Sequence, residues 1–107
     1  MATFAEHIEA ATHRQPIEAI AIGPYGWDGY SDNEMVPADK QNRVLTWREA
    51  KPLLGYEYSS SYGAPQCHAV TVWTRDWIVF VSQYDGSTSI HALPRNPRDI
   101  KPEMPGG

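Results

Sequence analysis

The stretch CHAVTVWTRDWIVFVSQYDGSTSIHAL, residues 67–93, decides the fold of this chain. Runs of branched and aromatic residues within it are separated by the short polar segments TRD and Asp85-Gly86. An Asp-Gly pair between two such runs is a strong hairpin signal, because both residues tolerate the positive φ of a type I′ turn. We therefore predict a three-stranded antiparallel meander over residues 67–73, 77–83 and 88–93.

The two turns of this meander set the expected register of its strands. A two-residue loop at Asp85-Gly86 fixes the second pairing. For the first pairing, a three-residue loop over residues 74–76 places Val72 opposite Ile78 and groups apolar side chains on both faces. A two-residue Arg75-Asp76 loop would shift the register by one residue and invert every side chain of one strand. We favour the three-residue loop because it groups residues of like character.

A fourth strand is predicted at residues 17–23, IEAIAIG. It is nearly all apolar and branched, which is typical of a strand buried on both faces. Both faces of the meander are apolar as well, so helices on one side would leave the second face to be covered. The long loops, the C-terminal tail or another chain would then have to supply that cover.

Two short helices, about residues 3–13 and 47–54, complete the predicted fold. Each begins with a threonine followed three residues later by a glutamate, which is the capping-box pattern. Those pairs are Thr3 with Glu6 and Thr46 with Glu49. The sequence thus predicts a single α+β domain over residues 1–97, with a small antiparallel sheet and long aromatic-rich loops. Residues 98–107 are rich in proline and glycine, which predicts an extended or disordered tail.

The composition excludes several classes of partner. The chain has 107 residues and a net charge of -4, and residues 1–63 hold nine acids against five bases. No cluster of Lys and Arg could follow a phosphate backbone, so we expect no nucleic-acid partner. No apolar run approaches the roughly 18 residues of a membrane span, so we expect no membrane partner. Cys67 is the only cysteine, which fits a reducing, cytoplasmic location.

Catalytic and metal-binding patterns are weak throughout the sequence. Cys67 and His68 adjoin each other on a strand, so their side chains should point to opposite faces and cannot form a nucleophile–base pair. His68 and His91 should lie about 10 Å apart across the middle strand, too far to share a zinc ion. We therefore predict no catalytic residue, no cofactor and no metal, and we treat an enzyme as the minority interpretation.

The candidate binding residues lie in two segments, GPYGWDGYSDN at residues 23–33 and GYEYSSSYGAP at residues 55–65. Loops that combine Tyr, Trp, Ser, Gly and Asp have the composition of antibody paratopes, in which rigid rings give contact area at low entropic cost. The predicted contact rings are Tyr25, Trp27, Tyr30, Tyr56, Tyr58 and Tyr62. The predicted acidic contacts, which would meet a basic patch on a protein partner, are Asp28, Asp32 and Glu34.

Alternative interpretations remain for the same residues. The rings could fold back over the open sheet face, which would leave no surface for a partner. The chain could instead sequester a small ligand such as a nucleotide, with phosphate contacts from Arg75, Arg95 or Arg98. A homodimer through the second apolar sheet face is compatible with every one of these functions.

A resemblance to a known group of proteins supports the interpretation that the chain binds a protein partner. Residues 46–97, with the motifs WT-x-x-W-x-x-FVS-x-YDGST and PRNP, resemble small uncharacterised proteins of actinobacteria and their phages. The resemblance implies a small cytosolic accessory protein, and a phage-encoded one would often bind and inhibit a host component. No functional residue carries over from that group.

Overall fold

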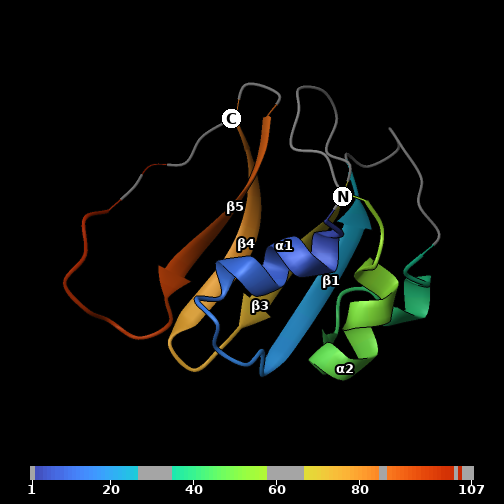
Figure 1. The fold of residues 1–107 in the computed structure, drawn as a ribbon, viewed down its shortest axis with the longest axis horizontal. Coiled ribbons are helices and arrows are strands. Elements are labelled where there is room, and N and C mark those ends of the chain that lie inside the picture. Colours follow the sequence, from blue (N-terminus) through green and yellow to red (C-terminus); the bar gives the residue numbers. More distant parts are fainter. Residues whose placement is uncertain (1, 27–34, 58–66, 85–86, 103, 105–107) are drawn as a thin grey trace.

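A computed structural model describes residues 2–26, 35–57, 67–84, 87–102 and 104 (Figure 1). The elements are α1 (Phe4–Ala11), β1 (Ala19–Tyr25), η1 (Ala38–Lys40), β2 (Val44–Leu45), α2 (Trp47–Ala50), η2 (Lys51–Leu54), β3 (His68–Trp73), β4 (Trp77–Tyr84) and β5 (Ser87–Pro94). The strands form one antiparallel sheet in the order β2-β1-β3-β4-β5. This confirms the predicted α+β class, with β2 as a strand that the sequence analysis did not include.

Both predicted capping boxes are present and begin the two α-helices. Thr3 accepts a hydrogen bond from the backbone of Glu6, whose carboxylate accepts one from the Thr3 backbone, and Thr46 and Glu49 repeat the arrangement. The second helix continues only as the 3₁₀ turn η2, because Pro52 lacks the N–H that an α-helical turn would use.

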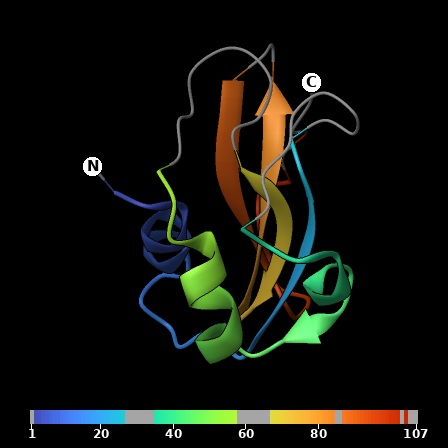
Figure 2. The same ribbon diagram turned by 90° about the vertical axis from the view of Figure 1, so that its right-hand side faces the viewer.

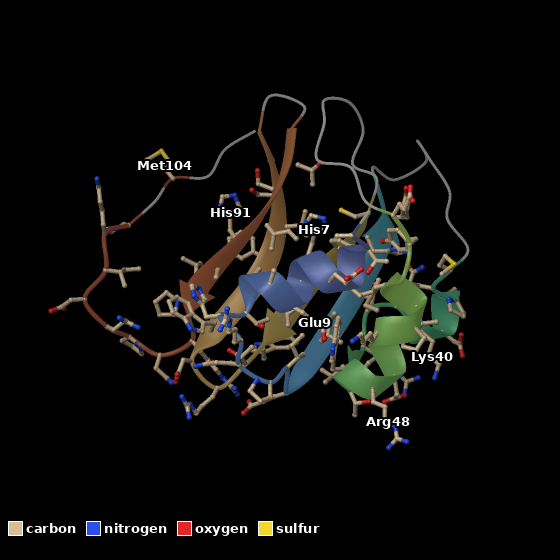
Figure 3. All side chains as sticks on the ribbon, viewed as in Figure 1. His7, Glu9, Lys40, Arg48, His91 and Met104 are labelled. Atoms are coloured by element: carbon tan, nitrogen blue, oxygen red, sulfur yellow. The ribbon has the colours of Figure 1, made fainter. Side chains whose placement is uncertain are left out.

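The two helices pack on the same side of the sheet, and Figure 2 shows this layer in side view. Glu9 points from α1 toward α2 (Figure 3), where its Oε2 accepts hydrogen bonds from Trp47 Nε1 and Lys51 Nζ, both at 3.2 Å. The fully buried side chains between helices and sheet include Phe4, Ile8, Ile20, Ile22, Leu54, Val72 and Val79.

The register between β3 and β4 differs from the prediction by one residue. Val72 lies opposite Val79, not opposite Ile78, so the connecting turn is the two-residue Arg75-Asp76 loop. The predicted three-residue loop is wrong. The register between β4 and β5, set by the two-residue loop at residues 85–86, is confirmed from Tyr84 opposite Ser87 onward.

Gln15 explains the register of the β3–β4 turn. Its Oε1 accepts hydrogen bonds from Thr74 Oγ1 at 2.8 Å and from the Asp76 backbone N–H at 3.1 Å, while its Nε2 donates to Asp76 Oδ2 at 2.6 Å. Gln15 follows two residues with positive φ, His13 at 54° and Arg14 at 66°, which turn the chain from α1 toward β1. The turn is therefore held by a side chain that is distant in the sequence.

The observed register gives the sheet two different faces. The helix-facing side is aliphatic, and its members are Ile20, Ile22, Val70, Val72, Val79, Val81 and Ile90. On the other side, Trp73, Ile78 and Leu93 share one row, and no helix of the described residues covers it (Figure 2). Along β1 buried residues alternate with half-buried ones, so the prediction that residues 17–23 are buried on both faces is wrong.

The sheet forks between β3 and β4. These strands pair only through residues 71–73 and 78–80. Beyond that point residues 68–70 continue to pair with β1, and residues 81–84 continue to pair with β5. Within the described strands, no ladder pair joins these two separated portions. The fork opens toward the end of the sheet at which β3 begins.

Candidate functional site

The forked end of the sheet is where the candidate binding segments join the described fold. The end of β1, the start of β3, the end of β4 and the start of β5 all lie at this end, because neighbouring strands are antiparallel. The Gly26 N–H donates to the Cys67 carbonyl at 2.9 Å. Gly26 and Cys67, the described residues next to positions 27 and 66 in the sequence, therefore lie at neighbouring points of the sheet.

A cluster of rings occupies this end and joins both segments. The ring centroid of Tyr25 lies 6.0 Å from that of Tyr56 and 5.2 Å from that of His68, both in edge contacts. Tyr56 also stacks on Phe4 of α1 at 5.7 Å. The irregular register of β1 after Ile22 adds a residue before Tyr25 pairs with His68. Such a bulge redirects the side chains that follow it, so it brings Tyr25 to the histidine.

Hydrogen bonds in the cluster determine how the imidazole is protonated. The Tyr56 hydroxyl accepts a bond from the His68 backbone N–H at 2.9 Å and lies 2.7 Å from His68 Nδ1. A hydroxyl has one hydrogen, and its natural acceptor here is Nδ1. We therefore assign the proton of the neutral ring to Nε2. That atom is buried and has no hydrogen-bond partner in the described part of the chain.

Burial keeps the polar groups of this cluster neutral. Desolvation lowers the pKa of His68 from 6.5 to about 4 and raises the pKa of Cys67 to about 12. Desolvation also raises the pKa of the Tyr56 phenol above its ordinary value. At neutral pH the site therefore presents an uncharged imidazole, a thiol and a phenol, which suits hydrogen bonding better than nucleophilic chemistry.

A hollow of about 110 Å³ lies in the fork beside the ring cluster. Its lining comes from both separated strands, from the start of β5 and from Gly26 after β1. The lining residues are Gly26, Cys67, His68, Ala69, Val81, Ser82 and Thr88. None of them carries a formal charge, and the lining combines small apolar groups with the buried imidazole.

Of the nine predicted binding residues, the structure describes two. Tyr25 and Tyr56 are both half-buried and come together at the forked end. Trp27, Asp28, Tyr30, Asp32, Glu34, Tyr58 and Tyr62 lie outside the described residues, so their roles remain predictions. For Tyr56, the interpretation that loop rings fold back is favoured, because its hydroxyl is bonded inside the cluster.

The arginines that a nucleotide site would need are engaged elsewhere. Arg75 pairs with Asp76 at 3.1 Å, and Arg95 pairs with Glu18 and also donates to the Thr74 carbonyl oxygen. The Arg98 guanidinium lies over the Trp77 ring. These contacts favour a structural use of the three arginines. Among the described residues, no three His, Cys, Asp or Glu side chains gather as a metal site would require.

Sequence reasoning considered His68 only as a partner for Cys67 or for zinc and so missed its contact with Tyr56. The available signal was its position two residues before Val70 on a strand whose alternate residues face the core. A histidine at such a position needs a hydrogen-bond partner, and a tyrosine in a nearby loop can supply one. Gln15 carried no comparable signal.

Comparison with known proteins gives this chain no relatives from which a function could be transferred. None of the helices in the described part of the chain is long and apolar enough to span a membrane. No protein-family model, curated protein or solved structure matches the chain.

Proposed function

We propose that this chain is a small non-catalytic binding protein that recognises another protein through the two Tyr- and Trp-rich segments at residues 25–34 and 56–62. The acidic side chains Asp28, Asp32 and Glu34 would meet a basic patch on the partner. The resemblance to phage and actinobacterial proteins suggests a host protein as the partner, with inhibition as the outcome of binding. A cytoplasmic location and a phage origin belong to this proposal.

The observation that supports this proposal most is the convergence of both segments on one end of the sheet. The Gly26 to Cys67 hydrogen bond and the contact between Tyr25 and Tyr56 bring together their points of attachment. Rigid scaffolds that present variable segments side by side are a common arrangement for protein recognition. A single contact surface can therefore include both segments.

Affinity capture from host lysate tests the proposal. The comparison uses the wild type, the double variant Trp27→Ala/Tyr30→Ala and the control Val44→Ala. Val44 is an apolar side chain on β2 that is 68% exposed, so this control removes exposed apolar surface elsewhere. We expect one partner, identified by mass spectrometry, to be recovered with the wild type and the control but lost with the double variant. Equal recovery in all three would refute the proposed surface.

The acidic contacts have their own test. The triple variant Asp28→Asn/Asp32→Asn/Glu34→Gln keeps the size of each side chain and removes three charges. At low ionic strength we expect the triple variant to associate with the captured partner more slowly than the wild type does. At high salt the two rates should become similar.

Light scattering of the pure protein separates this function from self-association through the open sheet face. A stable dimer whose formation removed the segments from solvent would favour the homodimer.

A further inference from the structure

His68 lines the hollow in the fork and is fully buried. Among the described residues, its Nε2 has no hydrogen-bond partner. Because Nδ1 is occupied by the Tyr56 hydroxyl at 2.7 Å, Nε2 carries the proton that the protein leaves unsatisfied. Buried donors in native proteins are nearly always satisfied, so an isolated one indicates that something else supplies the acceptor.

The lining restricts the charge of what can enter. No described lining residue is charged, and burial lowers the pKa of His68 to about 4, so the imidazole is neutral at physiological pH. A carboxylate or phosphate would therefore lose its hydration without a compensating cation, which is costly. An uncharged acceptor avoids that loss. A carbonyl oxygen satisfies Nε2–H and leaves the ligand neutral.

The volume restricts the size of the ligand. An apolar cavity of about 150 Å³ accommodates benzene, whereas this hollow measures about 110 Å³. A group of about four heavy atoms is the corresponding size. A primary carboxamide with one carbon attached has that size. Its amide N–H groups can also donate to the hydroxyl of Ser82, which lines the hollow.

We propose that the fork between β3 and β4 is a binding site for an uncharged carboxamide group, whose carbonyl oxygen accepts a hydrogen bond from His68 Nε2. The carboxamide comes either from a free small molecule or from an Asn or Gln side chain of a protein. The described residues that line this site are Gly26, Cys67 and residues of β3, β4 and β5, and none of them is a predicted contact residue of the proposed function.

Titration with acetamide, followed by NMR of protein labelled with ¹⁵N in histidine, tests the site. We expect saturable shifts of the His68 ring nitrogens, with a dissociation constant on the order of millimolar, as befits so small a ligand. Acetate serves as the charged comparison and should bind at least about tenfold more weakly. N-acetylasparagine methylamide serves as the peptide arm. Binding by acetamide alone indicates a free small ligand, and binding by both indicates that a protein side chain can enter.

A filling variant distinguishes the hollow from other surfaces. Val81→Ile adds one methyl group to the lining without removing a polar group, and Val44→Ile adds the same group on exposed β2. We expect Val81→Ile to weaken acetamide binding at least about fivefold while Val44→Ile leaves it unchanged. Far-ultraviolet circular dichroism confirms that both variants are folded. If Val81→Ile does not fold, Ala69→Val provides the second filling variant.

Three results would overturn this proposal. One is the absence of any saturable shift up to molar acetamide. Another is binding that the filling variants leave unchanged. The third is a long-lived water beside His68 Nε2, seen as a persistent water–imidazole cross-peak, that acetamide does not displace. Loss of partner capture by the Trp27→Ala/Tyr30→Ala variant has no bearing on these results, so the two proposals can fail separately.

Discussion

At the Arg75-Asp76 end of the sheet, hydrogen bonds from two distant parts of the chain meet on one turn. Gln15 contacts both Thr74 and Asp76, and the Arg95 N–H donates to the Asp76 carbonyl at 2.9 Å. At the other end, β3 and β4 separate, a hollow opens between them, and no described residue forms a hydrogen bond with His68 Nε2. The same pair of strands is thus closed at one end and open at the other.

The difference indicates where the protein places stability and where it can place recognition. Polar side chains at the closed end satisfy one another, which fixes the register of the sheet. At the open end, a buried polar group and two half-buried tyrosines adjoin the segments with the predicted contact residues. Rigid elements commonly support a site whose polar groups are less completely hydrogen-bonded. The predictions below measure the contrast between the two ends.

The largest effect should come from the closed end. Gln15→Ala removes the acceptor of two hydrogen bonds and the donor of a third, to a carboxylate at 2.6 Å. We expect the free energy of unfolding to fall by about 3 kcal/mol, measured by urea denaturation. Gln41→Ala is the matched control, because Gln41 Nε2 donates one bond, to the Val36 carbonyl at 3.2 Å. A loss no larger than that of the control would show that the turn holds its own register.

At the open end, the Tyr56 hydroxyl should contribute less. Tyr56→Phe leaves the His68 backbone N–H without its acceptor and Nδ1 without its donor, while the ring can still stack on Phe4. We expect a loss of about 2 kcal/mol in the free energy of unfolding. The His68 ring nitrogens should also shift in the ¹⁵N spectrum. Unchanged ring shifts would contradict the assigned Nε2–H tautomer.

The pH dependence of stability reports on the same histidine. Folding lowers the pKa of His68 from 6.5 to about 4, so the unfolded chain binds the proton first and stability falls as pH decreases from about 7 toward 4. Between about pH 7 and pH 5 we expect a loss on the order of 1.5 kcal/mol from this residue. The carboxyl groups with lowered pKa titrate below this window. His68→Gln should have a flatter profile than the wild type across it, and an equally steep profile would exclude His68 as the cause.

The smallest effect should come from the helix cap beside the ring cluster. Thr3→Ala removes the capping box of α1 next to the Phe4 N–H, which donates to the Tyr56 carbonyl at 2.8 Å. We expect a loss of about 1 kcal/mol. Thr46→Ala removes the equivalent box of α2 and should cost a similar amount. If only Thr3→Ala also broadens the His68 signals, the α1 cap helps to position the open end.

Local patterns were sufficient to predict the parts of the fold that local interactions determine. Both capping boxes connect residues three apart, and the β4–β5 register has the pairing that the Asp85-Gly86 pair predicted. The second predicted helix, about residues 47–54, corresponds to α2 and η2 together. In each case the residues that determine the structure are neighbours in the sequence, so the pattern contains the cause.

The β3–β4 register required information that is absent from the local sequence. Grouping apolar residues on each face favoured a three-residue turn, yet Gln15 satisfies the backbone and side chain of Asp76 in the two-residue turn. Sixty-one positions separate these two residues. The correct register places the aliphatic residues under the helices and Trp73 with Ile78 on the open face. Hydrophobic grouping alone could not distinguish this arrangement from its neighbour.

For the candidate site, the structure describes only two of the predicted contact residues. Tyr25 and Tyr56 were named as contact residues from their place in unusual loops, and the structure joins them. The alternation of β3 could have indicated that His68 is buried and needs a hydrogen-bond partner, but the fork beside it could not be foreseen, because it depends on where the β3–β4 ladder ends. The position at which this ladder ends depends on the pairing of β3 with β1 and of β4 with β5.

Because β3 and β4 pair over a short length, the β4–β5 hairpin can rotate relative to the rest of the sheet. Within the described strands, three residue pairs join this hairpin to β3. All three lie near the Arg75-Asp76 turn, so the hairpin can pivot about that turn. A small rotation there becomes a larger displacement farther along the hairpin, where Ser82 and Thr88 line the hollow together with His68. Mechanical load on the hairpin tip, applied by a neighbouring molecule or by an optical trap, would thus widen or narrow the fork without unfolding the core.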